Sequence, residues 1–190
     1  MAIRRAVGIA VAVVLVWSTY ASAAGMFTLT HVTVRLYDAV GLNAAVTRQV
    51  RSGVADTFGS AGVEVTWLDC SSGAAAACRA PLGAGELTVR IVTLPAPAGH
   101  DGPVPLADAL IDRRLKSGVL ATVYFDRVQT VAQNAGTDVG DLLAHTVAHE
   151  IAHLLAGTDH HDSGGLMRPV WTVRELRRNE SGTWAFEPRH

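Results

Sequence analysis

Apolar and polar residues alternate along four short stretches of the chain, which is the pattern of half-buried strands. The stretches are residues 31–40, 63–70, 86–94 and 119–128. In the first of them, Val32, Val34 and Leu36 alternate with Thr33 and Arg35, so one face of the strand is apolar and the other is polar. The sequence therefore predicts a four-stranded sheet.

Residues 43–62 have the period of an amphipathic helix. An apolar side chain recurs there at every fourth position: Val46, Val50, Val54 and Phe58. Asn43 can cap the first turn, and Gly59 and Gly62 end the helix. This helix is expected to pack on one face of the sheet.

A second helix is predicted to run to about Ala156, with Thr137 or Asp138 as its cap. One side of it carries an apolar stripe made of Leu143, Val147, Ile151 and Leu154. Before this helix, residues 95–105 break all periodicity and are expected to form a loop, and residues 106–116 are expected to form a short helix. The order of elements indicates one α/β (α+β) domain over residues 24–190, with a mixed sheet.

Residues 1–23 have the features of a secretory signal peptide. The positive segment "MAIRR" precedes an apolar stretch of 12 residues, and "ASA" at 21–23 offers small residues for cleavage. An uncleaved membrane anchor is the alternative, although a membrane span needs roughly 20 apolar residues. We therefore expect a secreted or extracytoplasmic bacterial protein with no stable membrane association. The net charge of −1 and the lack of a basic stripe argue against a nucleic-acid partner.

The chain has two cysteines, Cys70 and Cys78, which bracket the segment "SSGAAAA". In an oxidising compartment such a pair is expected to form one intramolecular disulfide. The alternatives are two unpaired thiols or a contribution to a zinc site, for which a second cysteine pair is lacking.

Histidines are concentrated in one part of the chain. Five of the eight lie between His145 and His161, and the run includes HEIAH at 149–153. On a helix, His149 and His153 are about 40° apart around the axis and about 6 Å apart along it, so both imidazoles can bind one ion. Glu150 lies beside them, where it can act as a general base on water activated by the metal. The alternative is an accidental surface helix.

A catalytic zinc ion takes three protein ligands and keeps one position open. Downstream of HEIAH, three candidates for the third ligand are adjacent: Asp159, His160 and His161. His145, one helical turn before His149, is a candidate fourth ligand, but we expect it to be a surface or supporting residue. His145 and Tyr124 are also candidates for stabilising an oxyanion.

The stretch "HEIAHLLAGTDHHDSGGLM" resembles the zincin metallopeptidases of the metzincin kind. It is most similar to a group of small secreted bacterial putative metallopeptidases whose pattern reads HExxH-LLLG-xxxH-xxxGxM. The match includes His149, Glu150, His153, Gly157, His161, Gly165 and Met167. Because the glycine lies one residue later than in other metzincins, the resemblance favours His161 as the third ligand, with His160 and then Asp159 as alternatives.

This resemblance implies a zincin-like fold and a secreted zinc metallopeptidase, most simply an endopeptidase, with one catalytic Zn²⁺ and Glu150 as general base. Met167 would belong to a turn beneath the metal, although core packing is an equally simple role for it. An extended peptide substrate would pair with an antiparallel edge strand near residues 119–126. The alternative function is a zinc-stabilised secreted binding protein without turnover. A third arrangement would have both His160 and His161 on the metal.

Overall fold

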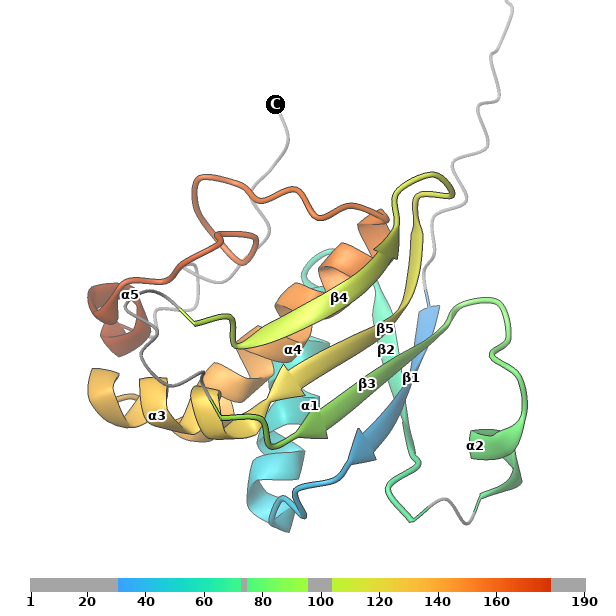
Figure 1. Cartoon of the computed structure of the whole chain (residues 1–190), viewed down its shortest axis with the longest axis horizontal. Coiled ribbons are helices and arrows are strands. Elements are labelled where there is room, and N and C mark those ends of the chain that lie inside the picture. The colour runs from blue at the N-terminus through green and yellow to red at the C-terminus, as the bar shows by residue number, and fades with distance from the viewer. Residues whose placement is uncertain (1–30, 73–74, 96–103, 179–190) are drawn as a thin grey trace, which may run out of the picture.

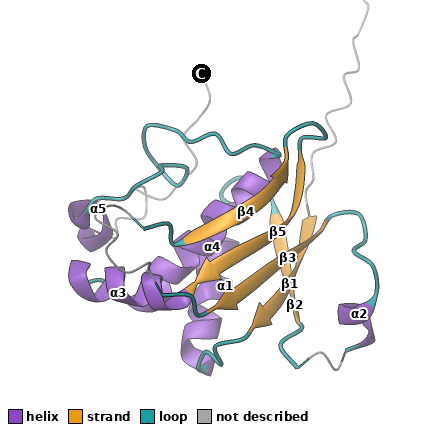
Figure 2. Ribbon diagram, viewed as in Figure 1, coloured by secondary structure: helices purple, strands orange, loops and turns teal. Residues whose placement is uncertain are grey.

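The computed structural model describes residues 31–72, 75–95 and 104–178. Within these ranges it is a mixed α/β fold around one five-stranded sheet, with strands in the order β2-β1-β3-β5-β4 (Figures 1 and 2). The predicted signal peptide and the middle of the predicted 95–105 loop lie outside the described residues.

Four strands of the sheet are parallel and one is antiparallel. Strands β1 (His31–Asp38), β2 (Glu64–Asp69), β3 (Glu86–Val92) and β5 (Ser117–Tyr124) run in the same direction. Strand β4 (Ala107–Asp112) pairs antiparallel with β5 and forms one edge of the sheet. The other edge is β2.

Helices α1 (Ala44–Gly59) and α4 (Val139–Ala156) pack against each other on one face of the sheet (Figure 1). Helix α3 (Phe125–Ala135) packs on α4, and the short α5 (Val173–Arg178) lies beside α3. The short helix α2 (Ala76–Arg79) belongs to the connection from β2 to β3. The core lies between the sheet and the helices, where Val34, Val89 and Val123 from three strands are fully buried.

The two helices with clear patterns form as predicted. The Asn43 side chain caps α1 by accepting hydrogen bonds from the backbone N–H groups of Ala45 and Val46. The apolar stripe of α1 faces the core, with Val50, Val54 and Phe58 buried. Since capping and amphipathic period are properties of neighbouring residues, the sequence is sufficient to place these elements.

The predicted number of strands was wrong, because residues 106–116 form β4 and a tight turn rather than a short helix. In β4 the half-buried Ala107, Ala109 and Ile111 alternate with exposed residues. Alanine and leucine are good helix formers, and alanine and aspartate are depleted in strands. Pairing with β5 outweighs that preference.

The expected strand over residues 119–128 is correct only as far as Tyr124, where β5 ends and α3 begins. Helix α3 was not predicted, although Val128, Ala132 and Ala135 form a buried helical stripe and Gly136 ends it in the left-handed region. The assignment of residues 119–126 as the antiparallel edge was also wrong. Strand β5 is interior, parallel to β3, and the antiparallel edge strand is β4.

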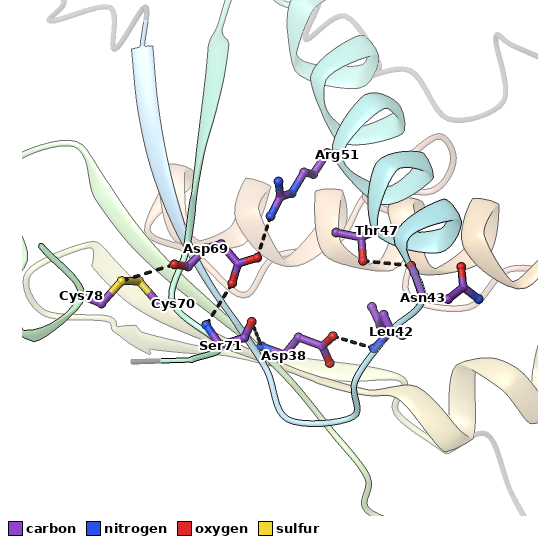
Figure 3. A network of polar contacts seen from close by, with 9 residues as sticks. All are labelled: Asp38, Leu42, Asn43, Thr47, Arg51, Asp69, Cys70, Ser71 and Cys78. Atoms are coloured by element: carbon purple, nitrogen blue, oxygen red, sulfur yellow. Dashed lines mark hydrogen bonds and ion pairs between the residues drawn. A yellow bond between two sulfur atoms is a disulfide. The ribbon is translucent and has the colours of Figure 1, made fainter. Parts of the chain in front are cut away.

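The predicted disulfide between Cys70 and Cys78 is present, and both residues are buried (Figure 3). The backbone carbonyl of Asp69, just before Cys70, lies 3.6 Å from the Cys78 sulfur. The Asp69 carboxylate accepts a hydrogen bond from the Ser71 N–H and pairs with Arg51 of α1 at 3.3 Å. These contacts fix the end of β2 against α1 and against the loop that follows.

No helix in the described ranges is long and apolar enough to cross a membrane.

Candidate metal centre

Helix α4 begins and ends at residues that define its limits locally. Asp138 accepts hydrogen bonds from the N–H groups of Gly140 and Asp141. Gly157 ends the helix in the left-handed region with φ of 60°. A Cβ at Gly157 would lie only 1.9 Å from the backbone oxygen of Lys116 in the β4–β5 turn, so this position requires glycine. The tight contact fixes the direction in which the chain leaves the helix.

Three histidine side chains converge beyond the last turns of α4. The Nε2 atoms of His149 and His153 are 2.9 Å apart, and each lies 3.3 Å from Nε2 of His161. His149 and His153 come from adjacent turns of α4, and His161 comes from the segment after Gly157. In the part of the chain that the structure describes, these three side chains form the group that could hold a metal ion.

The other ring nitrogens of the two helical histidines determine which tautomer is present. His149 Nδ1 lies 2.7 Å from the Leu166 carbonyl, and His153 Nδ1 lies 2.8 Å from the Thr158 carbonyl. A carbonyl only accepts hydrogen bonds, so each Nδ1 carries the hydrogen, and each neutral ring points a lone pair from Nε2 at the centre. Lone pairs facing one another repel, and a cation between them removes the repulsion.

The spacing of the three nitrogens fits a zinc ion. Zn–N bonds of about 2.0–2.1 Å at tetrahedral angles place ligand nitrogens about 3.3 Å apart. Two of the three separations equal that value, and the third is a few tenths of an ångström shorter. The three imidazoles therefore form a site that can hold one metal ion and leave a fourth position open.

The structure distinguishes the three candidate third ligands. His161 joins the cluster and is its exposed member. The His160 side chain is 78 % exposed and faces Asp162 at 4.0 Å. Asp159 is turned away to form an exposed ion pair with Arg113 of the β4–β5 turn. His161 is thus the candidate that lies against His149 and His153, and the arrangement with two ligands from the 160–161 pair is not formed.

Glu150 is buried beside the cluster, with 6 % of its surface exposed. Burial, together with the negative charge of Asp108 on β4, raises the pKa of its carboxyl group to about 8. Burial also lowers the pKa of His149 to about 4, which keeps its imidazole neutral and able to ligate. A carboxyl group with a raised pKa next to a metal-ligating set is suited to accept and return a proton.

Other predicted residues take supporting or separate positions. His145 is half-buried near Asp141, where burial lowers its pKa to about 4, and it does not join the cluster. Tyr124 donates its hydroxyl hydrogen to Asp108. Met167 is partly buried and packs against the core, which agrees with the simple packing role. The two helical histidines are largely covered, since His149 and His153 are only 7 % and 4 % exposed.

Two features of the site were not predicted from the sequence. The Leu166 and Thr158 carbonyls orient the metal-ligating rings, and no sequence pattern marks a backbone acceptor. The Trp171 ring packs edge-on against His149, with 5.7 Å between ring centroids. An aromatic residue soon after the histidine-rich segment is a signal that could have identified this contact.

A pocket of about 440 Å³ opens beside His149, Glu150 and His161. Its wall is mostly apolar and comes from residues 104–107, Val131, 169–171 and Leu176. Ala107, the first residue of β4, thus borders the same pocket as Glu150. In Figure 1 the segment after α4 runs back past β4 toward α5, and its residues 168–171 also line the pocket.

Comparison of the sequence with models of known protein families finds no match, and comparison with curated proteins finds no significant match either.

Proposed function

We propose that this protein is a secreted zinc-dependent peptidase of the zincin (metzincin-like) kind, with His149, His153 and His161 as metal ligands. The observation that carries the proposal is the position of Glu150. Its buried side chain lines the same pocket as His149 and His161. A purely structural zinc site normally has four protein ligands. It has no open position and needs no buried carboxyl group beside the metal.

Each residue of the site has a separate role in the proposed hydrolysis of a peptide bond. A bound zinc ion would supply Lewis acidity for water and for the substrate carbonyl. Glu150 accepts a proton from the attacking water and later returns it to the leaving nitrogen. The Leu166 and Thr158 carbonyls hold the His149 and His153 rings in the ligating tautomer.

The substrate is proposed to be an extended peptide that pairs with β4. Strand β4 is the antiparallel edge of the sheet, and Ala107, its first residue, borders the pocket that contains Glu150. Strand addition to an open edge supplies backbone hydrogen bonds whatever the side chains of the peptide are. The proposed binding strand therefore moves from residues 119–126 to Ala107–Asp112.

Two further observations support the proposed class and location. A mixed sheet with an antiparallel edge strand beside a helix that carries HExxH agrees with the resemblance to zincins. The buried Cys70–Cys78 disulfide supports an oxidising, extracytoplasmic compartment, which agrees with the signal peptide predicted at residues 1–23.

The substitution Glu150→Gln tests the proposal. The zinc-loaded parent should hydrolyse an unstructured protein such as casein, and a chelator should abolish the activity. Glu150→Gln should bind one zinc ion per chain, yet hydrolysis should fall by about 10²–10⁴, the range for losing a general base. Glu64→Gln, at an exposed glutamate of β2, is the matched control and should keep parental activity.

Metal content and turnover together separate the two candidate functions. One zinc per chain with no hydrolysis by the parent would favour the zinc-stabilised binding protein. Near-parental turnover by Glu150→Gln would overturn the assigned role of Glu150.

A further inference from the structure

The wall of the pocket beside the candidate metal centre includes Arg168, the cationic member of an ion pair. Arg168 pairs with Glu175, and their side chains are 35 % and 24 % exposed. Of the two, Arg168 lines the pocket, whereas Glu175 does not. The pocket wall therefore presents the cationic member of the pair, while the anionic member lies outside it.

Glu175 is held in place by the start of α5. Its carboxylate accepts hydrogen bonds from the N–H of Thr172 at 2.7 Å and from the Thr172 hydroxyl at 2.6 Å. The Thr172 hydroxyl in turn lies 3.3 Å from the Glu175 N–H, so the two residues form a capping box. These bonds direct the carboxylate toward the helix turn rather than toward the pocket.

Arg168 has hydrogen-bonding capacity left for a ligand. Its Nη1 donates to Glu175, and within the described ranges its guanidinium group makes no other hydrogen bond. A guanidinium group carries five N–H donors in a planar fork that matches a carboxylate. Nη2 and Nε are therefore available to an acceptor that enters the pocket.

The Thr146 hydroxyl, which also lines the pocket, does not compete for such an acceptor. The Thr146 hydroxyl donates to the Leu142 carbonyl at 2.8 Å. An anionic group would thus lie at the Arg168 end of the pocket, with its apolar part against Trp171 and Leu176.

We propose that Arg168 is a specificity-determining residue that selects ligands with an apolar body and a terminal carboxylate. The role of Arg168 in substrate choice rests on the proposed peptidase function, whereas its preference for a carboxylate can be tested by binding alone. In a peptide, the carboxylate could come from an acidic side chain next to the scissile bond or from a free C-terminus. A cationic group in the same position would face Arg168 and be rejected.

The binding experiment uses three probes with the same apolar body: 5-phenylvalerate, its amide and 5-phenylpentylamine. Their affinities for the zinc-loaded full-length protein are measured by calorimetry. The parent should bind the carboxylate roughly tenfold more tightly than the amide, as expected for a charge-assisted hydrogen bond at a partly exposed site. The amine should bind more weakly than the amide.

Variants separate Arg168 from the metal as the source of this preference. Arg168→Gln should reduce the ratio of carboxylate to amide affinity to near one, because a neutral glutamine lacks the positive charge that favours the carboxylate. Arg174→Gln removes the same charge from an exposed position of α5 outside the pocket, and it should keep the parental ratio. If Arg168→Gln does not fold, Arg168→Lys serves instead and should show a reduced ratio, since it loses the planar fork.

An unchanged ratio in Arg168→Gln, or no preference for the carboxylate in the parent, would overturn the inference. Binding can succeed although casein hydrolysis fails, so failure of the inference and failure of the proposed function are distinguishable. The source of the carboxylate is then found with peptides bound to Glu150→Gln. One peptide carries glutamate and an amidated C-terminus, and the other carries glutamine and a free C-terminus, and the tighter binder identifies the source.

Discussion

The β2–β3 connection and the segment after α4 are held in place by different kinds of contact. The connection between β2 and β3 is closed by the Cys70–Cys78 disulfide and by the buried Arg35, which donates to the Ala80 and Pro81 carbonyls and to Glu86. The segment from Gly157 to Thr172 has no regular secondary structure. The disulfide and Arg35 close the first segment, whereas the second brings three imidazole nitrogens together at a point that could hold a metal ion.

The second segment does have some anchors of its own. Leu166 is completely buried, and its carbonyl and that of Thr158 receive hydrogen bonds from the two helical histidines. The Asp162 N–H donates to the Met167 carbonyl at 2.9 Å. The segment from Gly157 to Thr172, named the metal segment below, is thus preformed by backbone contacts, and its His161 completes a cluster that could hold a metal ion.

The largest effect should follow from removing the third ligand. His161→Ala should lower zinc affinity by more than about a hundredfold, which is the upper range for losing only a partner that orients a ligand. His160→Ala is the matched control, because His160 is exposed and outside the cluster, and it should bind zinc like the parent. Competition with a chromophoric chelator measures both. Parental affinity in His161→Ala would contradict the assigned ligand set.

A smaller but still large effect is expected at the turn that starts the metal segment. Gly157→Ala would place a Cβ against the Lys116 carbonyl in a left-handed conformation, and it should cost about 3 kcal/mol or more of unfolding free energy. Gly62→Ala has a similar φ of 76° but open space around its Cβ, so it should cost about 1–2 kcal/mol. Urea unfolding measures the free energy of unfolding of both variants. Equal losses would show that the contact with the Lys116 carbonyl does not contribute to the cost.

Opening the disulfide should affect the other segment. The variant with both Cys70→Ala and Cys78→Ala should lose about 2–3 kcal/mol of unfolding free energy, since the loop that the disulfide closes is short. Hydrogen exchange should rise in residues 75–86 and stay unchanged around His149 and His161. Zinc affinity should equal that of the parent, and a large fall in it would show that the two segments are coupled.

The smallest effect is expected at the exposed ion pair between the metal segment and the β4–β5 turn. The side chains of Arg113 and Asp159 are 78 % and 56 % exposed, so water screens their attraction. Arg113→Ala should change zinc affinity by less than about fivefold. A change as large as that of His161→Ala, measured with the same chelator, would mean that this pair, rather than the backbone contacts, holds the metal segment.

Local patterns predicted α1, α4 and most of β1, β2, β3 and β5, but they missed α3 and β4. Asn43 and Asp138 cap α1 and α4, and Gly157 ends α4, as expected from neighbouring residues alone. Strand β4 was missed because its short sequence has a weak strand preference, and what makes it a strand is pairing with β5. Helix α3 was missed because its first residues continue the apolar run of β5, so periodicity alone did not show where Tyr124 ends the strand.

The sequence by itself determined that His149 and His153 lie on one side of the predicted helix, because residues four apart face the same way, and that Glu150 lies beside His149. It also determined the position of the turn at Gly157, because few residues other than glycine adopt that conformation. Only the tertiary structure decided that His161 rather than His160 meets the helical pair. It alone decided that β4 is the open edge, and that Arg168 rather than Glu175 lines the pocket. These outcomes depend on where distant segments pack. The free energy of that packing comes from contacts between residues far apart in the chain, which local sequence patterns do not show.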